Sequence, residues 1–302
     1  MGIEVTVKNR QLFKKALKIE DLTLGKYACG TSDEYARNTC EQGDGDLIVY
    51  NPEKIGRGII VSNWNSNIKD EISLRVNFLS TRYDMEMFYE IIRNVMCVWK
   101  SKNFEQDGGV YTEDDIDALC KGNKELSLRY MVDMCKDKKP DDSAFTIFGA
   151  MFPLDLDTDL LINFGFKKNE EGYADYLHGL QSMDVYYAVP AVYRRKDKES
   201  AFWGAYSVTA TVDTVFPLKP RAPLFFKNPD TNEDLKCDFF VVSLYSLAQK
   251  KTLAIMSFED FYRLAGVENC QTFDKTHVVI KGISEEKMAE MAASDYVNPL
   301  EE

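Results

Sequence analysis

The chain of 302 residues is 45% hydrophobic and 28% charged, which is ordinary for a globular protein and excludes a disordered chain. Its net charge of −12 at pH 7 repels phosphate backbones, so we do not expect a nucleic-acid partner. No run approaches the roughly 18 consecutive apolar residues of a membrane helix, so we expect no membrane contact. Seven cysteines without a Cys-x-x-Cys pair, together with the lack of a secretory signal, favour free thiols and a cytoplasmic location.

In the first half of the chain, residue periodicity predicts the secondary structure. Apolar residues that alternate with polar ones predict strands near 3–7, 46–50, 58–61 and 72–78. Helical spacing predicts helices over 11–22, 83–99 and 124–135, and acidic residues after Thr112 indicate another helix start. The helix over 83–99 has the clearest signals, because its apolar residues fall on one stripe and Thr81 with Asp84 resembles a capping pair.

A charged segment with one proline, residues 136–143, lies between two apolar regions and predicts a linker. Aromatic residues are concentrated after it, which favours strands there. We therefore expect an α+β protein with a mixed N-terminal lobe over 1–139 and a β-rich C-terminal lobe over 140–302. The strands of the second lobe should be mainly antiparallel, with a few peripheral helices. A single merged domain is the alternative.

The second half of the chain predicts more strands than helices. Strands are predicted over 145–152, 224–227, 237–244, 252–256 and 277–281. Helices are predicted near 157–163, 173–183 and 258–264, with a last helix after Ser284. A long hairpin is predicted from 185–193 and 202–215, joined by a charged turn at 196–199.

Three aspartates, Asp155, Asp157 and Asp159, alternate after the strand predicted over 145–152. Carboxylates at a strand tip could hold Mg²⁺ or Ca²⁺ through hard oxygen ligands, as in a metal-dependent hydrolase or phosphotransferase. The run superficially resembles the Asp-x-Asp-x-Thr signature of haloacid-dehalogenase-type phosphotransferases. The match fails, because Thr158 comes one position too early and Asp159 holds the place of the threonine. The preferred alternative is a helix start with Asp157 or Thr158 as N-cap.

The predicted hairpin carries the first set of candidate binding residues. Adjacent aromatic residues in its arms must divide between the two faces of a strand, which exposes some of them. Tyr193 and Trp203 are the candidates for an exposed aromatic surface. The basic pair Arg194 and Arg195 is a candidate for a contact with an anion or a partner. Core packing of the aromatic residues and a solvated loop tip are the alternatives.

A second set of candidates consists of Pro217, Pro220 and Pro223, which recur at every third position. That spacing places the three rings on one edge of a polyproline II helix, a geometry that aromatic grooves recognise. The alternative is a stiff connector between the hairpin and the next strand.

Few residues of this chain suit catalysis. There are only two histidines, His178 and His277, and no Walker-type or dinucleotide-binding glycine motif, so we expect no cofactor. The sequence therefore predicts a non-enzymatic protein-binding or adaptor protein, whose acidic character suits a basic partner. A metal-dependent enzyme using the three aspartates and a small-ligand binder between the lobes are the alternatives. The oligomeric state is left open.

Overall fold

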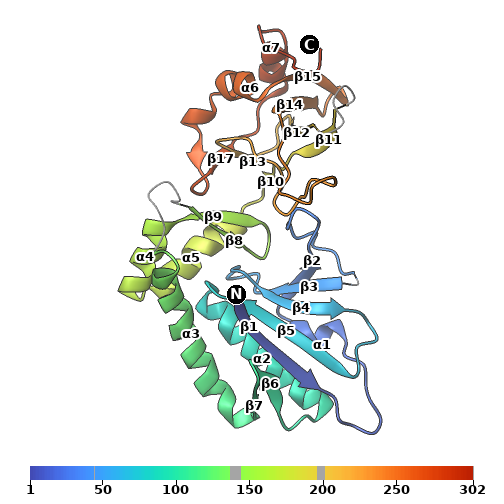
Figure 1. Ribbon diagram of the computed structural model, residues 1–302, viewed down its shortest axis with the longest axis vertical. Helices are drawn as coiled ribbons and strands as arrows, with labels where there is room; N and C mark the ends of the chain where they lie inside the picture. The colour runs from blue at the N-terminus through green and yellow to red at the C-terminus, as the bar shows by residue number, and fades with distance from the viewer. Residues whose placement is uncertain (44, 137–143, 196–200, 302) are drawn as a thin grey trace. The chain divides into compact units, whose positions relative to one another are not determined.

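The computed structural model describes residues 1–43, 45–136, 144–195 and 201–301. The chain divides into two compact units, Met1–Met183 and Asp184–Glu302 (Figure 1). This division falls later in the chain than the boundary expected at 136–143, because α4 (Thr158–Lys167) packs on α3 (Ile116–Asp133) in the first unit. Residues 137–143 of the expected linker lie outside the described part of the chain.

Unit 1 is built on an antiparallel sheet of seven strands in the order β2-β3-β4-β5-β1-β6-β7. Its strands are β1 (Gly2–Lys8), β2 (Ala28–Thr31), β3 (Gly45–Tyr50), β4 (Ile59–Trp64), β5 (Glu71–Asn77), β6 (Phe104–Gln106) and β7 (Gly109–Tyr111). Alternate residues of the central strands, such as Ile3, Val5 and Val7 in β1, are buried and make one face of the sheet apolar.

Helix α2 (Arg82–Trp99) packs against this apolar face and shares its core. The Thr81 hydroxyl accepts from the Asp84 backbone N–H at 3.1 Å, and the Asp84 carboxylate accepts from the Thr81 backbone N–H at 2.8 Å. The predicted helix and its capping pair are therefore confirmed. A turn, η1 (Glu113–Asp115), leads into α3, which runs unbroken where two helix signals were predicted.

The helix predicted over 11–22 is wrong for most of its length, since α1 spans only Ile19–Thr23. Tertiary hydrogen bonds hold the preceding residues out of a helix. The carbonyl of Lys15 accepts from the Trp99 indole at 3.0 Å, and the backbone N–H of Leu17 donates to the carbonyl of Ile68 at 2.9 Å. Leu12, which contributed to the predicted apolar face, is 91% exposed.

Unit 1 is completed by a two-stranded hairpin and two helices. Strands β8 (Ala144–Phe148) and β9 (Pro153–Asp157) replace the single strand predicted over 145–152, because the chain turns back between them. The Gly149 backbone N–H donates to the Phe152 carbonyl at 3.2 Å and closes this turn. Helices α4 and α5 (Glu170–Gln181) follow.

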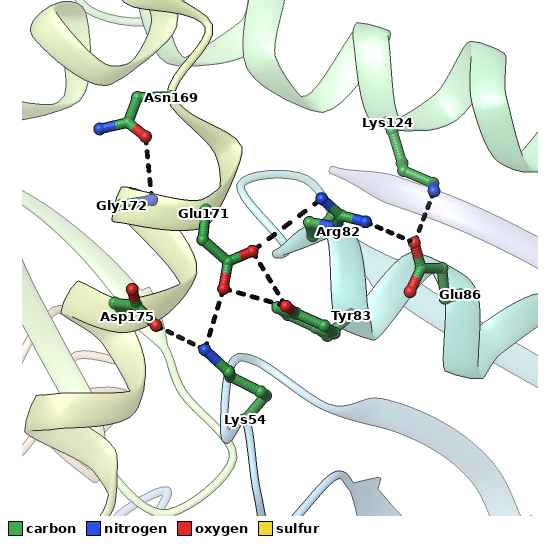
Figure 2. A network of polar contacts seen from close by, with 9 residues as sticks. All are labelled: Lys54, Arg82, Tyr83, Glu86, Lys124, Asn169, Glu171, Gly172 and Asp175. Atoms are coloured by element: carbon green, nitrogen blue, oxygen red, sulfur yellow. Dashed lines mark hydrogen bonds and ion pairs between the residues drawn. The ribbon is translucent and has the colours of Figure 1, made fainter.

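A network of polar side chains links α5 to α2 and to the loop before β4 (Figure 2). Lys54 pairs with Asp175 at 2.6 Å and Glu171 at 3.0 Å, and these bonds raise the pKa of Lys54. The Tyr83 hydroxyl donates to Glu171 at 2.9 Å. Because most of these side chains are solvent-exposed, the network orients α5 more than it stabilises the unit.

Unit 2 contains two four-stranded sheets. The first has the order β10-β13-β17-β16, and its strands are β10 (Tyr186–Tyr187), β13 (Thr214–Pro217), β16 (Gln271–Thr272) and β17 (His277–Ile280). The second has the order β11-β12-β14-β15, and its strands are β11 (Ala191–Arg194), β12 (Phe202–Thr209), β14 (Phe239–Ser246) and β15 (Lys251–Ser257). Along the chain, β10 is followed by β11 and β12 of the other sheet, then come β13, the pair β14 and β15, and the pair β16 and β17, so the chain passes several times between the two sheets.

The long hairpin predicted from 185–193 and 202–215 is shorter in the structure, because only β11 and β12 pair as its arms. Strands β10 and β13, which were expected to extend those arms, pair in parallel in the other sheet. Strands β12 and β14 are also parallel, and the remaining strand pairs of both units are antiparallel. The expected α+β class with mainly antiparallel strands is confirmed.

The core of unit 2 combines the inward faces of both sheets with two helices. Helices α6 (Phe258–Ala265) and α7 (Glu285–Ala292) contribute Phe258, Phe261 and Met288, all nearly inaccessible to solvent. A short turn, η2 (Val267–Asn269), follows α6. Tyr206 of β12 and Phe216 of β13 meet with ring centres 5.4 Å apart, so the two sheets share one core.

All seven cysteines are free thiols, as expected. Cys97 is exposed on α2, although apolar residues flank it in the sequence. Within the described residues, no helix combines the length and the apolar character that crossing a membrane requires.

Candidate binding surface

The sheet β11-β12-β14-β15 brings together Tyr193 and Trp203, the two aromatic residues predicted to bind a partner. They lie directly opposite each other on β11 and β12, with ring centres 4.5 Å apart and planes 22° from parallel. Trp203 in turn lies opposite Phe239 of β14, with ring centres 6.0 Å apart and planes 7° from parallel. The three rings form a stacked row across three strands, which we call the aromatic ladder.

The aromatic ladder lies on the face of the sheet that turns away from the core. Its neighbours along β12, Phe202 and Gly204, are buried, whereas Trp203 is only half-buried. Tyr193 is 48% exposed and forms the most accessible end of the row. Period-two alternation therefore places one ring of each adjacent aromatic pair inside and the other outside.

The two predicted arginines lie on opposite sides of the edge strand. The guanidinium of Arg195 lies over the Phe239 ring, 5.8 Å from its centre, and pairs with Asp238 at 3.7 Å. That of Arg194 lies over the Phe202 ring, 5.2 Å from its centre, and pairs with Asp230 at 3.2 Å. Each guanidinium is thus held between an aromatic face and a carboxylate.

Phe239 is the member of the aromatic ladder that sequence reasoning missed. It lies 36 positions after Trp203 and reaches it only through the parallel pairing of β12 with β14. No local pattern signals such a pairing. The charged turn expected at 196–199 lies outside the described residues.

The three prolines do not form an exposed edge. Pro217 ends β13 and is buried, Pro223 is also buried, and Pro220 is half-buried. The Leu218 backbone N–H donates to the Thr276 carbonyl at 2.8 Å and ties this segment to the turn before β17. Burial of two of the three rings favours the interpretation of a stiff connector over that of a ligand for an aromatic groove.

The three aspartates have separate structural roles. Asp155 is buried in β9 and accepts from the Thr146 hydroxyl at 2.5 Å. Asp157 is the N-cap of α4 and accepts from the Asp159 backbone N–H at 2.8 Å, as the preferred interpretation predicted. Asp159 is exposed. Across the described residues, no group of three or more His, Cys, Asp or Glu side chains is arranged to hold a metal ion.

A buried polar cluster surrounds His277 in unit 2. The imidazole Nδ1 lies 2.9 Å from Asp274 Oδ1, and Nε2 lies 3.2 Å from the Tyr187 hydroxyl. Asp274 Oδ1 also accepts from the backbone N–H of His277 at 2.9 Å. An aspartate that orients an imidazole also occurs in catalytic sites. Here both ring nitrogens already have protein partners, and the cluster fixes the start of β17.

The structure thus defines an α+β protein of two compact units. The second unit carries the aromatic ladder on the face of the sheet β11-β12-β14-β15 that turns away from its core. The chain belongs to the family described as "Domain of unknown function (DUF4299)", which it matches over residues 2–291. Comparison with curated proteins gives no match, and comparison with solved structures gives none either.

Proposed function

We propose that this protein binds a partner protein through the aromatic ladder of Tyr193, Trp203 and Phe239. The observation that carries the proposal is the stack itself, which is half-buried at Trp203 and Phe239 and exposed at Tyr193. Three aromatic rings lie in contact on the outer face of a sheet, where burial in the core does not explain their presence. Tyrosine and tryptophan are the residues on which binding energy most often concentrates at protein interfaces.

The proposed partner presents a basic, arginine-bearing segment. The net charge of −12 attracts basic surfaces and repels acidic ones over several ångströms. The surface around the aromatic ladder also suits guanidinium groups, since it already holds one of its own, Arg195, between the Phe239 ring and Asp238. A partner arginine over the exposed Tyr193 ring would repeat that arrangement.

Selection of peptides from a displayed random library tests the proposal. The full chain should enrich peptides that contain arginine together with apolar residues. Calorimetric titration of a selected peptide should show binding that weakens about tenfold or more in Tyr193→Ala and in Trp203→Ala. Added salt should weaken it further, because the attraction is partly electrostatic.

The matched control is Tyr186→Ala, which removes another exposed tyrosine of unit 2 from the other sheet. It should leave the affinity unchanged. Circular dichroism of each variant separates loss of binding from loss of fold. Selected peptides without basic residues, or peptides that bind Tyr193→Ala and Trp203→Ala as tightly as the unaltered chain, would refute the proposal.

A further inference from the structure

Unit 1 contains a cavity of about 320 Å³ that is remote in sequence from the aromatic ladder. It lies between the face of the large sheet opposite α2 and the hairpin strand β8. Ile60 of β4 and Arg75 of β5 line it from the sheet, and Phe145, Thr146 and Phe148 line it from β8. This volume is at the lower end of the range for pockets that bind small molecules.

The charged side chains of the lining are two arginines, Arg57 and Arg75, and no aspartate or glutamate belongs to it. Their charges are close enough for Arg75 to lower the pKa of Arg57, although burial is the main cause and lowers that pKa to about 10. Two like charges beside one cavity, without an acidic group in its wall, create a positive potential inside it.

The guanidinium of Arg57 makes its hydrogen bonds to neutral groups, although the charge of the nearby Asp84 raises its pKa. Its Nε donates to the Phe148 carbonyl at 3.0 Å, and its Nη1 donates to the Phe78 carbonyl. The nearby Asp84 carboxylate does not pair with this guanidinium, because it accepts from the backbone N–H groups of Arg57 at 3.1 Å and Gly58 at 2.9 Å and from Thr81. A buried cation without a paired carboxylate favours an anionic ligand.

The guanidinium of Arg75 makes no hydrogen bond or ion pair with any residue that the structure describes, although the backbone of Arg75 pairs with β1 and β4 in the sheet. Its neighbour across the β1–β5 pair is Glu4, whose carboxylate accepts instead from the Ser73 hydroxyl at 2.8 Å. The guanidinium of Arg75 is therefore available to a ligand. Its planar fork of donors matches the two oxygens of a carboxylate or phosphate.

The uncharged residues that line the cavity indicate what the part of the ligand beyond its anionic group should be. Asn77 supplies a polar group, the Thr146 hydroxyl already donates to Asp155, and Ile60, Phe145 and Phe148 supply apolar surface. We propose that this cavity binds a small organic oxyanion, with its carboxylate or phosphate on Arg57 and Arg75 and its apolar body against the phenyl rings. This site is separate from the proposed protein-binding surface, and either can fail without the other.

Calorimetric titration of the full chain with four probes tests the inference. Phenyl phosphate and phenylacetate should bind saturably at concentrations up to about 10 mM, and the tighter of the two identifies the preferred oxyanion. The neutral phenylacetamide should bind about tenfold more weakly or not at all, because it carries no charge. Inorganic phosphate should also bind more weakly, because it leaves the apolar wall unused.

The diagnostic variant is Arg75→Gln, since the Arg75 side chain makes no hydrogen bond or ion pair that would hold the described part of the fold. It should weaken binding of the better probe about tenfold or more. Arg93→Gln is the matched control, because it removes the same charge from the exposed side of α2, where Arg93 pairs with Asp117 at 3.0 Å. It should leave binding unchanged.

Three results would overturn the inference. They are no saturable binding of either anionic probe, equal binding of phenylacetamide and phenylacetate, and equal binding by Arg75→Gln and the unaltered chain. Equal binding of inorganic phosphate and phenyl phosphate would remove the apolar part of the proposed ligand.

Discussion

Replacing Asp84 with asparagine tests how a single carboxylate organises unit 1. Asp84 is 1% exposed and accepts four hydrogen bonds. Its Oδ2 accepts from the backbone N–H of Arg57 at 3.1 Å and from both the N–H and the hydroxyl of Thr81 at 2.8 Å, while Oδ1 accepts from the N–H of Gly58 at 2.9 Å. One side chain thus caps α2 and fixes the loop before β4.

The size of the expected change in the free energy of unfolding follows from these contacts. In Asp84→Asn the amide nitrogen fits best at the Oδ1 position, where it faces one donor rather than three. The Gly58 N–H is then buried without an acceptor, which costs about 1–3 kcal/mol. The three remaining bonds lose their charge-assisted character, at roughly 0.5 kcal/mol each. The free energy of unfolding should therefore fall by about 3 kcal/mol.

Urea unfolding followed by tryptophan fluorescence measures this change, because Trp64 and Trp99 are both buried in unit 1. The control is Asp115→Asn. Asp115 makes the same capping bonds to Thr112, at 2.8 and 2.9 Å, but it is only half-buried and holds no second segment. The control should lose clearly less stability. Equal losses in the two variants would refute the argument that burial and the loop contacts give Asp84 its effect.

Two further predictions concern acid stability and thiol reactivity. The hydrogen bond from Arg263 at 2.8 Å is the main cause that lowers the pKa of Asp260 in the folded protein. The contribution of ionised Asp260 to the free energy of unfolding is therefore complete above the unfolded pKa of about 3.9. It is lost as the pH falls through the lower folded pKa. Asp260→Asn should be less stable than the unaltered chain at pH 7, and thermal unfolding should show this difference shrinking at acidic pH; a constant difference would contradict the linkage. Burial raises the pKa of Cys237 to about 11, so at pH 8 a disulfide reagent should label the exposed Cys40 and Cys97 first, as mass spectrometry of labelled peptides will show. Labelling of Cys237 as fast as Cys97 would contradict this order.

The parts of the fold that sequence predicted best are those set by local chemistry. Helix α2 has a capping pair, Thr81 and Asp84, and a single apolar stripe, so its start and its buried face were both predictable. The strand β1 was predictable because its alternation matches a sheet with one buried face. The predicted helix over 11–22 failed because hydrogen bonds to distant residues decided that segment.

The residues of the candidate sites were likewise predictable only where they are close in sequence. Tyr193 and Trp203 were found because the two arms of a short hairpin are close in sequence. Phe239 was missed because a parallel pairing brings it in from a later strand. Arg57 and Arg75 carry no motif, and only the folding of β8 over the sheet makes them neighbours of one cavity.

In unit 2 the chain passes several times between the two sheets, and this strand order limits how early in folding each sheet can form. The sheet β11-β12-β14-β15 takes all of its strands from residues 191–257, whereas the sheet β10-β13-β17-β16 needs strands from residues 186 to 280, so no fragment that ends before β17 contains both sheets. Folding must therefore close long loops before the sheet β10-β13-β17-β16 can form, which slows the reaction relative to a unit made only of local hairpins. A ribosome must release nearly all of residues 184–280 before the shared core can assemble, so truncations within this range should leave an aggregation-prone product.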